Sequence, residues 1–272
     1  MSPRVRVMGV VNVTPDSFSD GGRLATVEAA VAHALRLVEQ GADVLDIGGE
    51  STRPGAEPVN AAEEIARTAP VIEALRARTA AQISIDTLKP EVALAAVEAG
   101  ATMWNDVSAL TFSHDSFATA AALGCDVVLM HMKGEPRTMQ AAPVYQDVVA
   151  EVTGYLSDRA DAAIAAGVAR GRIWLDPGIG FGKTADHNLA LTAELERLIA
   201  LGFPVLYAAS RKRTILSLDP TATDPLDRLG GSLALALEGV RRGARMVRVH
   251  DVRETVQALT VQAAVQAAFR AD

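Results

Sequence analysis

Short apolar runs rich in β-branched residues alternate with longer segments of helical spacing, and the alternation repeats eight times along the chain. Such runs are typical of strands buried on both faces, whereas apolar positions three and four residues apart predict one face of a helix. We expect strands near residues 5–11, 43–47, 82–86, 102–105, 126–130, 172–176, 204–208 and 246–249. We expect helices near residues 26–40, 61–78, 89–99, 115–123, 144–166, 187–201, 227–242 and 252–269.

Six glycines mark the ends of expected helices, since each stands just after a helical segment and shortly before a strand. They are Gly41, Gly100, Gly124, Gly167, Gly202 and Gly243. No Pro-rich or Ser-rich linker divides the 272 residues. Eight successive βα units therefore predict an α/β fold, a closed parallel TIM (β/α)8 barrel in which residues 1–272 form one domain.

Polar residues gather where the expected strands end. They are Asn12, Asp46, Asp86, Asn105, His131, Asp176, Ser210 and His250. Any one of them is explained equally well as a cap of the next helix. That explanation fails for all eight, because several stand many residues before their helix. In barrels of this kind the C-terminal rim of the strands carries the active site, so we expect the site there.

The composition limits the classes of function. A net charge of -7 argues against a general nucleic-acid binder, which needs a basic face. The N-terminus lacks the apolar segment of a signal peptide, and no apolar window is long enough to span a bilayer, so we expect a cytoplasmic protein. The single cysteine, Cys125, rules out an intrachain disulfide and suits a core position. Against this acidic background, the run from Arg211 to Arg213 suggests a site for a small anion.

The stretch from Asp176 to Lys183 reads Asp-Pro-Gly-Ile-Gly-Phe-Gly-Lys and follows a buried run. Its carboxylate stands at a strand end, and Gly178, Gly180 and Gly182 would let backbone amides approach a ligand closely. The spacing fits neither a Walker loop nor a dinucleotide fingerprint. We therefore expect a binding loop that is not a generic nucleotide cradle.

Two further loops hold polar residues among glycines. The loop from Asn12 to Gly22 contains one aromatic residue without a core role, Phe18, and suits a mobile lid, although a decorated turn is the simpler alternative. The loop from Gly48 to Gly55 carries Arg53. A guanidinium there would grip a carboxylate or a phosphate, although a solvated surface arginine is the simpler explanation.

Asp86, Asn105 and Asp176 offer two carboxylates and an amide at one rim. Such a set suits an N–H-rich heterocycle, because a carboxylate binds a guanidine-like edge through two parallel hydrogen bonds. A site for a hard metal ion is the alternative, since Asp and Asn oxygens also bind such cations. Zinc is not supported, because the sequence has no His-x-x-x-His or Cys-x-x-Cys spacing.

The loops after the seventh and eighth expected strands carry cationic side chains. Loops at these positions are a frequent phosphate site in such barrels, and a divalent ion would share the charge of a bound polyanion. Arg248 and His250 are two residues apart, so they face the same side of their strand. The other histidines considered are interpreted as surface or packing residues: His33, His114 and His187.

The motifs at the expected strand ends resemble those of the dihydropteroate synthase family, folate-pathway enzymes inhibited by sulfonamides. They occur in order over nearly the whole chain, at residues 8–22, 46–55, 84–87, 105–107, 130–132, 176–183, 210–212 and 248–250. The pterin-domain methyltransferases that act with corrinoid proteins share the barrel and the Asp and Asn set. They typically lack the loop from Asn12 to Gly22 and the Ser-Arg-Lys run.

The resemblance implies roles for individual residues. The pterin would be bound by Asp86, Asn105, Met130, Asp176, Gly180, Phe181 and Lys212. The diphosphate and its Mg²⁺ would be held by the metal ligand Asn12 and by Arg248 and His250. p-Aminobenzoate would lie against Thr52, Arg53, Pro54, Ser210 and Lys212. The lid would comprise Thr14, Pro15, Asp16, Ser17 and Phe18. The catalytic residues would be Asp86, Asp176, Lys212 and Arg248.

The implied reaction condenses 6-hydroxymethyl-7,8-dihydropterin diphosphate with p-aminobenzoate, by loss of diphosphate to a stabilised pterin cation. The resemblance also implies a homodimer. Two departures stand out: Ala208-Ala209, where Gly is common at one or both positions, and Arg213, where many members have Ser. The alternatives are a non-catalytic pterin-binding paralogue and a methyltetrahydrofolate-dependent methyltransferase domain.

Overall fold

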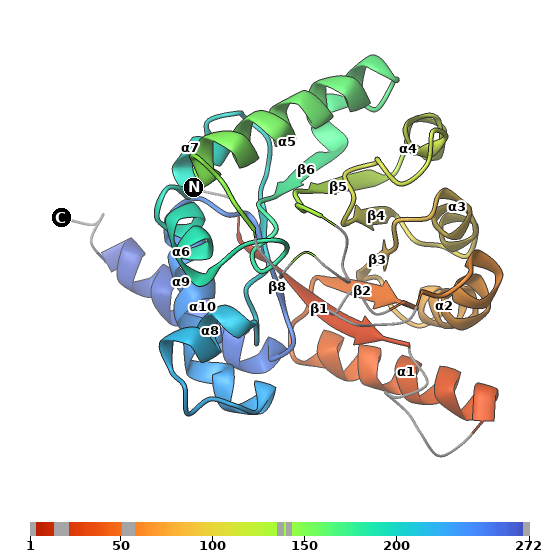
Figure 1. Cartoon of the computed structure of the whole chain (residues 1–272). Helices are drawn as coiled ribbons and strands as arrows, with labels where there is room; N and C mark the ends of the chain where they lie inside the picture. The colour runs from red at the N-terminus through yellow and green to blue at the C-terminus, as the bar shows by residue number, and fades with distance from the viewer. Residues whose placement is uncertain (1–3, 14–21, 51–57, 135–138, 140–142, 269–272) are drawn as a thin grey trace.

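A computed structural model describes residues 4–13, 22–50, 58–134, 139 and 143–268. Its strands form one parallel sheet in the order β6-β5-β4-β3-β2-β1-β8-β7, and a bridge between Leu175 and Val205 joins the two ends into a barrel (Figure 1). The strands are β1 Arg6–Asn12, β2 Val44–Gly48, β3 Gln82–Asp86, β4 Met103–Asp106, β5 Asp126–Met130, β6 Ile173–Asp176, β7 Leu206–Tyr207 and β8 Met246–Val249. The predicted TIM (β/α)8 barrel is confirmed.

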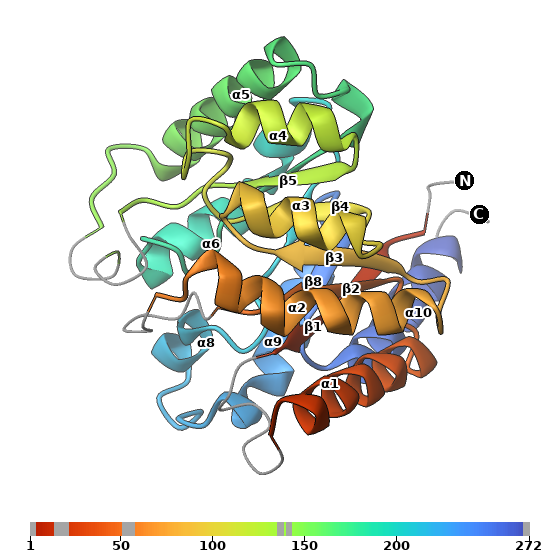
Figure 2. The same cartoon turned by 90° about the vertical axis from the view of Figure 1, so that its right-hand side faces the viewer.

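Helices surround the barrel, and successive helices contact one another on its outside (Figure 2). They are α1 Gly22–Glu39, α2 Ala61–Arg76, α3 Pro90–Glu98, α4 Ser116–Leu123, α5 Val148–Ala165, α6 Ala185–Ala193, α7 Leu195–Ile199, α8 Arg213–Leu218, α9 Leu229–Arg241 and α10 Val252–Ala268. Two short 3-10 helices, η2 Arg170–Arg172 and η3 Pro225–Arg228, precede β6 and α9. No helix in the described part of the chain is long and apolar enough to cross a membrane.

Two helical predictions need correction. The single helix expected at 187–201 is broken at Glu194 into α6 and α7, and the guanidinium of Arg242 donates to the carbonyl of Ala193 at the break. A side-chain donor therefore bonds the last carbonyl of α6. The short helix α8, in the loop after β7, was not expected at all.

The six glycines expected to end helices do so. Each has a positive φ, with values from 58° to 116°. Only glycine adopts this region without steric cost, which explains why the helices stop where they do. The helix ends predicted from the sequence accordingly lie within a few residues of the observed ones.

Side chains alternate between two cores along each strand. One core fills the barrel and the other lies between strands and helices. The buried residues inside the barrel are Met8, Val44, Met103, Val128, Trp174, Leu206 and Met246. Two residues further along the same strands, on the same inner side, stand Asp46, Asn105, Asp176 and Arg248. An apolar layer therefore underlies a polar one at the C-terminal rim.

Candidate active site

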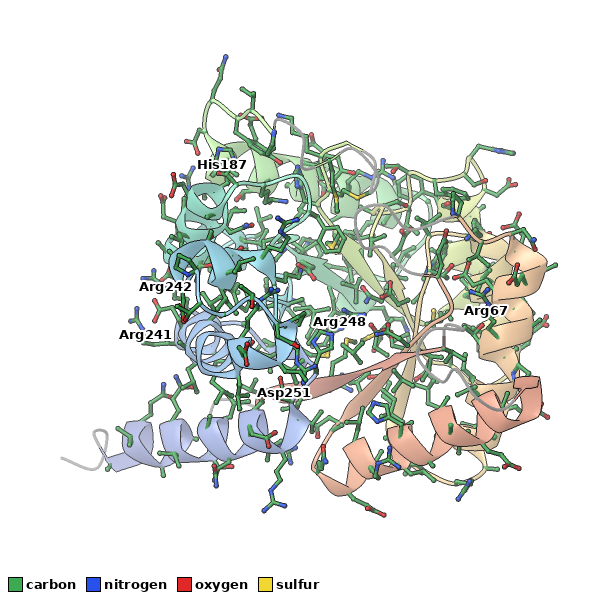
Figure 3. The ribbon with its side chains drawn as sticks, turned by 60° about the horizontal axis from the view of Figure 1, so that its bottom comes forward. Arg67, His187, Arg241, Arg242, Arg248 and Asp251 are labelled. Atoms are coloured by element: carbon green, nitrogen blue, oxygen red, sulfur yellow. The ribbon has the colours of Figure 1, made fainter. Side chains whose placement is uncertain are left out.

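Arg248 is the centre of a charged network inside the rim (Figure 3). Its Nε donates to Asp46 Oδ2 at 2.6 Å, and its Nη2 donates to Asp86 Oδ2 at 2.7 Å. Asn105 Nδ2 donates to the same oxygen of Asp46 at 3.1 Å. Strands β2, β3, β4 and β8 thus bring two carboxylates, one amide and one guanidinium together.

Asp46 and Asn105 of this network are buried, Asp86 and Arg248 are half-buried, and the loss of solvent shifts the pKa values of the charged groups. Burial raises the pKa of Asp86 to about 7, with Arg248 opposing and Asp46 adding to the rise. Burial opposes the charge of Arg248, but Asp46 and Asp86 hold its pKa above the usual value. Within the described part of the chain, Asp46 Oδ1 and Asp86 Oδ1 are buried without a hydrogen-bond partner. Unpartnered acceptors of this kind suit a ligand rich in N–H groups.

Asp176 ends β6 and accepts a hydrogen bond from Gly178 N at 2.7 Å on Oδ1. Burial raises the pKa of this carboxyl, while Lys212 and the Gly178 amide lower it. Asp176 and Met130 are directly opposite each other in the register of β5 and β6, and Asn105 and Asp86 are opposite in β4 and β3. The residues predicted to bind a heterocycle therefore occupy one continuous part of the rim.

Two of the glycines after Asp176 allow a close contact between two loops, whereas a close contact with a ligand was expected. A Cβ on Gly178 would lie 1.9 Å from His131 O, and a Cβ on Gly182 would lie 2.2 Å from Lys133 O. Both glycines have positive φ. The loop after β6 therefore packs its backbone against the loop after β5, rather than against a ligand, at these two positions. Gly180 instead faces the side chain of Lys212, 3.1 Å from the position of a Cβ.

Lys183, which received no role from the sequence, holds these two loops together. Its buried Nζ donates to the carbonyls of His131, Gly178 and Phe181 at 3.1, 2.9 and 3.0 Å. It also lies 2.9 Å from His131 Nδ1. Burial lowers the pKa of Lys183 to about 7, and Asp176 opposes this. The one signal in the sequence was a lysine at the end of a glycine-rich loop.

Lys212, which the resemblance assigns to the pterin, lies beside the Asp176 loop. Its Nζ donates to the carbonyl of Ile179 and lies 4.6 Å from the centre of the Phe181 ring. Burial lowers the pKa of Lys212 to about 8, and Asp176 opposes this. The structure therefore brings a cation, an aromatic face and a carboxylate together.

The run Arg211-Lys212-Arg213 does not form one cationic site. Arg211 pairs with Asp251 through two hydrogen bonds, of 3.0 and 2.5 Å, and has a positive φ of 57°. Arg213 is exposed and begins α8. Only Lys212 points toward the rim residues, so the predicted anion site reduces to this one cation.

Ser210 and His250 lie side by side after β7 and β8. Ser210 Oγ is 3.1 Å from His250 Nδ1 and accepts a hydrogen bond from the backbone N of His250 at 3.2 Å. Ala208 and Ala209, which stand before Ser210 at positions where the resemblance led us to expect Gly, are both buried. Ala209 belongs to the core between the strands and the helices.

Asn12 ends β1, next to Gly48 of β2 in the strand register. Its Oδ1 lies 3.8 Å from the position of a Cβ on Gly48, so the amide oxygen is near the open end of the barrel. No group of three or more His, Cys, Asp or Glu side chains in the described residues is arranged to hold a metal. Mg²⁺ typically keeps water ligands and takes one or two protein oxygens together with substrate phosphates. The single amide oxygen of Asn12 fits such a substrate-borne ion.

Two groups of predicted residues lie outside the described part of the chain. They are the lid residues Thr14, Pro15, Asp16, Ser17 and Phe18, and the p-aminobenzoate residues Thr52, Arg53 and Pro54. At the start of the second group, Glu50 accepts a hydrogen bond from Lys89 Nζ, which also bonds the buried Glu64 at 2.7 Å. This ion-paired cluster was not predicted from the sequence.

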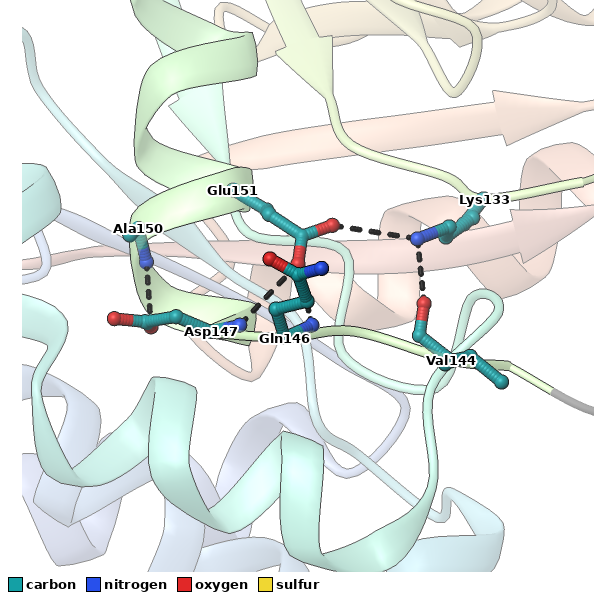
Figure 4. A pocket seen from close by; sticks show the side chains of 6 residues that line it. All are labelled: Lys133, Val144, Gln146, Asp147, Ala150 and Glu151. Atoms are coloured by element: carbon teal, nitrogen blue, oxygen red, sulfur yellow. Dashed lines mark hydrogen bonds and ion pairs between the residues drawn. The ribbon is translucent and has the colours of Figure 1, made fainter.

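The three histidines interpreted as surface or packing residues are confirmed in that role. His114 is exposed, His187 completes a capping box at the start of α6, and His33 is half-buried. A shallow pocket elsewhere contains none of the predicted site residues (Figure 4). It is lined by Lys133, Val144, Gln146, Asp147, Ala150 and Glu151.

Comparison with known proteins agrees with this geometry. The family model of pterin binding enzymes matches residues 8–250. Dihydropteroate synthase of Escherichia coli strain K12 is 46% identical over 255 residues, which cover 94% of this chain and 89% of the relative. Dihydropteroate synthase of a Synechocystis strain is 45% identical, over 93% of this chain and 88% of the relative.

Solved structures of the same enzyme have the same fold. Xanthomonas albilineans dihydropteroate synthase with 4-aminobenzoic acid has a TM-score of 0.91 at 56% identity, covering 97% of this chain and 94% of that one. The same enzyme in complex with 7,8-dihydropteroate has a TM-score of 0.88 at 53% identity, with the same coverage. The chain belongs to the dihydropteroate synthase family of pterin binding enzymes.

Proposed function

We propose that this chain condenses 6-hydroxymethyl-7,8-dihydropterin diphosphate with p-aminobenzoate at the barrel rim, releasing 7,8-dihydropteroate and diphosphate. It is a transferase that forms a C–N bond, as are the relatives described above. The observation that carries the proposal is the set Asp86, Asn105 and Asp176 at the rim, with Lys212 beside it; Asn105 and Asp176 are buried and Asp86 is half-buried. Carboxylates and an amide in a low-dielectric pocket match the N–H-rich edge of a pterin.

The same carboxylates suit the chemistry of the reacting carbon. An arylamine is a weak neutral nucleophile, so the C–O bond to diphosphate breaks first and leaves a delocalised pterin cation. Asp86 and Asp176 would stabilise that cation, and each well-placed charge is worth about 3–4 kcal/mol. The amine nitrogen then forms the C–N bond and loses its proton to the diphosphate or to water.

The departing diphosphate needs positive charge and hydrogen-bond donors. Arg248 has N–H groups beyond the two that bond Asp46 and Asp86, and His250 lies beside Ser210 on the neighbouring strand end. We assign both to the diphosphate. Mg²⁺, held by Asn12 together with the diphosphate oxygens, would supply further charge neutralisation when bound.

The second substrate would bind beside the pterin. We assign p-aminobenzoate to Ser210, Lys212 and residues 52–54, and we assign water exclusion to the lid at residues 14–18. Met130, Gly180 and Phe181 would line the pterin. The homodimer and the cytoplasmic location expected from the sequence stay predictions.

Product analysis tests the assignment. The purified protein is incubated with the pterin diphosphate, p-aminobenzoate and Mg²⁺, and the products are identified by mass. We expect dihydropteroate in amounts equal to the p-aminobenzoate consumed. A protein that binds the pterin but forms no dihydropteroate would be the non-catalytic paralogue instead, and methyl transfer from methyltetrahydrofolate would identify the methyltransferase alternative.

A further inference from the structure

Asp46 is buried inside the barrel and carries no role in the reaction proposed above. It lies in β2, two residues beyond Val44 of the barrel core, and is fully inaccessible to solvent. Its Oδ2 accepts two hydrogen bonds, from Asn105 Nδ2 at 3.1 Å and from Arg248 Nε at 2.6 Å. Both donors belong to side chains that the proposed function places against the substrate.

The contact with Asn105 decides which way its amide points. An ionised carboxylate only accepts hydrogen bonds, whereas an Asn side chain has one donor end and one acceptor end. Asp46 therefore binds the NH₂ end of Asn105, and the oxygen of Asn105 is left for another partner. Asn105 stands opposite Asp86 in the register of β3 and β4, so this acceptor lies next to a carboxylate.

The contact with Arg248 has a parallel effect. Arg248 Nε is held by Asp46, and its Nη2 reaches Asp86 Oδ2 at 2.7 Å. A guanidinium bonded at Nε on one side and at Nη2 on the other cannot rotate freely about its stem. One buried carboxylate thus orients two groups on different strands, which is how metal and active-site ligands are commonly held in place.

We propose that Asp46 is a positioning residue for pterin recognition, which turns the Asn105 amide so that its oxygen, rather than its NH₂ group, meets the N–H groups of the pterin. This inference rests on the proposed function, since it assumes that the rim binds a pterin. It predicts that loss of the acceptor at position 46 weakens binding of the pterin ring, even when the ligand carries no diphosphate.

Calorimetry with 6-hydroxymethyl-7,8-dihydropterin, which lacks the diphosphate, isolates this effect. In Asp46→Val the acceptor is gone, and the Kd should rise by at least about tenfold. In Asp46→Asn the side chain keeps one carbonyl oxygen that can accept from Asn105, so the Kd should lie much closer to that of the natural protein. Asp126→Val is the matched control, because Asp126 starts β5 at the opposite end of the barrel and bonds Gln82 and Arg172 there.

Each result has one meaning. A Kd for Asp46→Val within about twofold of the natural protein would overturn the inference, and so would equal weakening by the Val and Asn variants, because charge rather than orientation would then matter. Should Asp46→Val not fold, hydrogen exchange of the Asn105 side-chain amide in the natural protein decides: slow exchange supports the inference and rapid exchange overturns it. A natural protein that binds no pterin would overturn the proposed function as well. If the natural protein binds the pterin and the Asp46 variants do not show the expected change in Kd, only the inference about Asp46 is overturned.

Discussion

The ammonium group of Lys183 lies 2.9 Å from Nδ1 of His131, and both side chains are buried. Burial, reinforced by the charge of Lys183, lowers the pKa of His131 to about 3, so its imidazole is neutral and can accept at Nδ1. Because Lys183 also bonds the carbonyls of His131, Gly178 and Phe181, it joins the loops after β5 and β6. Asp176 and Phe181 lie at the two ends of the segment that it holds.

Replacement of Lys183 by Met should destabilise the protein. The carbonyl oxygens of His131 and Phe181 would lose their donor, whereas Gly178 O would keep its hydrogen bond from Phe181 N. We expect the free energy of unfolding to fall by about 3 kcal/mol, because each buried unsatisfied group costs about 1–3 kcal/mol. Denaturant unfolding of the Lys183→Met variant measures this. Lys133→Met is the control, since Lys133 is in the neighbouring loop and bonds Val144 O and Glu151 at the surface (Figure 4). Equal stability of the two variants would contradict the role given to Lys183.

Replacement of Gly178 by Ala tests the backbone contact between the same loops. The new Cβ would lie 1.9 Å from His131 O at a φ of 67°, so the loop must move. We expect a loss of about 2 kcal/mol or more in thermal or denaturant unfolding. In Gly154→Ala, where no atom lies within 4 Å of the new Cβ in α5, stability should instead rise by about 0.5–1 kcal/mol. A harmless Gly178→Ala would show that the loops do not touch.

Replacement of Asp176 by Asn removes one of the two carboxylates assigned to the pterin cation. The shape is kept, but the charge is lost, and turnover should fall by about 100-fold or more. Steady-state kinetics with both substrates measures the loss. Near-normal turnover in Asp176→Asn would show that this carboxylate does not stabilise the reacting pterin.

Lys212→Ala should weaken binding of the pterin diphosphate, because the ammonium group beside Asp176 and Phe181 is removed. We expect the Kd to rise by about tenfold, the usual cost of a charged hydrogen bond. Calorimetry with Lys133→Ala as the reference variant checks this. An unchanged affinity would remove Lys212 from the site.

The pKa of Asp86 predicts the pH dependence of the reaction. Burial raises this pKa from 3.8 to about 7, so in the free enzyme the carboxylate form grows as pH rises through 7. Because kcat/KM reports ionisations of the free enzyme, kcat/KM for the pterin diphosphate should rise with pH, reach half of its maximum near pH 7 and level off at higher pH. In the Asp86→Asn variant this rise of kcat/KM with pH should disappear. The same rise in both proteins would show that another group, such as one on the substrate, is titrating.

The same shift has a consequence for stability. Between pH 3.8 and about 7 the folded protein holds a proton on Asp86 that the unfolded chain has released. The contribution of Asp86 to stability therefore falls as pH rises across this window. Denaturant unfolding of the natural protein and of Asp86→Asn should show this difference in slope between pH 4 and pH 7.

Much of the fold follows from local sequence. The strands predicted at 82–86 and 126–130 coincide with β3 and β5, and the glycines after the helices have the positive φ that their positions implied. The break at Glu194 could not be predicted, because it accompanies a hydrogen bond from Arg242, which is far along the chain. Such a contact exists only after the helices have packed.

The site, too, has features that follow from the sequence and features that do not. The two-residue period of a strand places Asp86, Asn105, Asp176 and Arg248 on the inner side, and this follows from the sequence. The pairing of Arg248 with Asp46, 202 positions away, does not follow from the sequence. It depends on side-chain conformations across the barrel. The roles of Lys183 and Asp46 were missed for the same reason, since each is defined by partners on other strands or loops.

Release of diphosphate from the pterin diphosphate, measured with and without p-aminobenzoate in the presence of Mg²⁺, tests the central claim most directly. We expect release that depends on p-aminobenzoate, together with dihydropteroate formed in equal amount. Pterin binding without p-aminobenzoate-dependent release would contradict a synthase and would make the two alanines before Ser210 the first positions to replace with glycine.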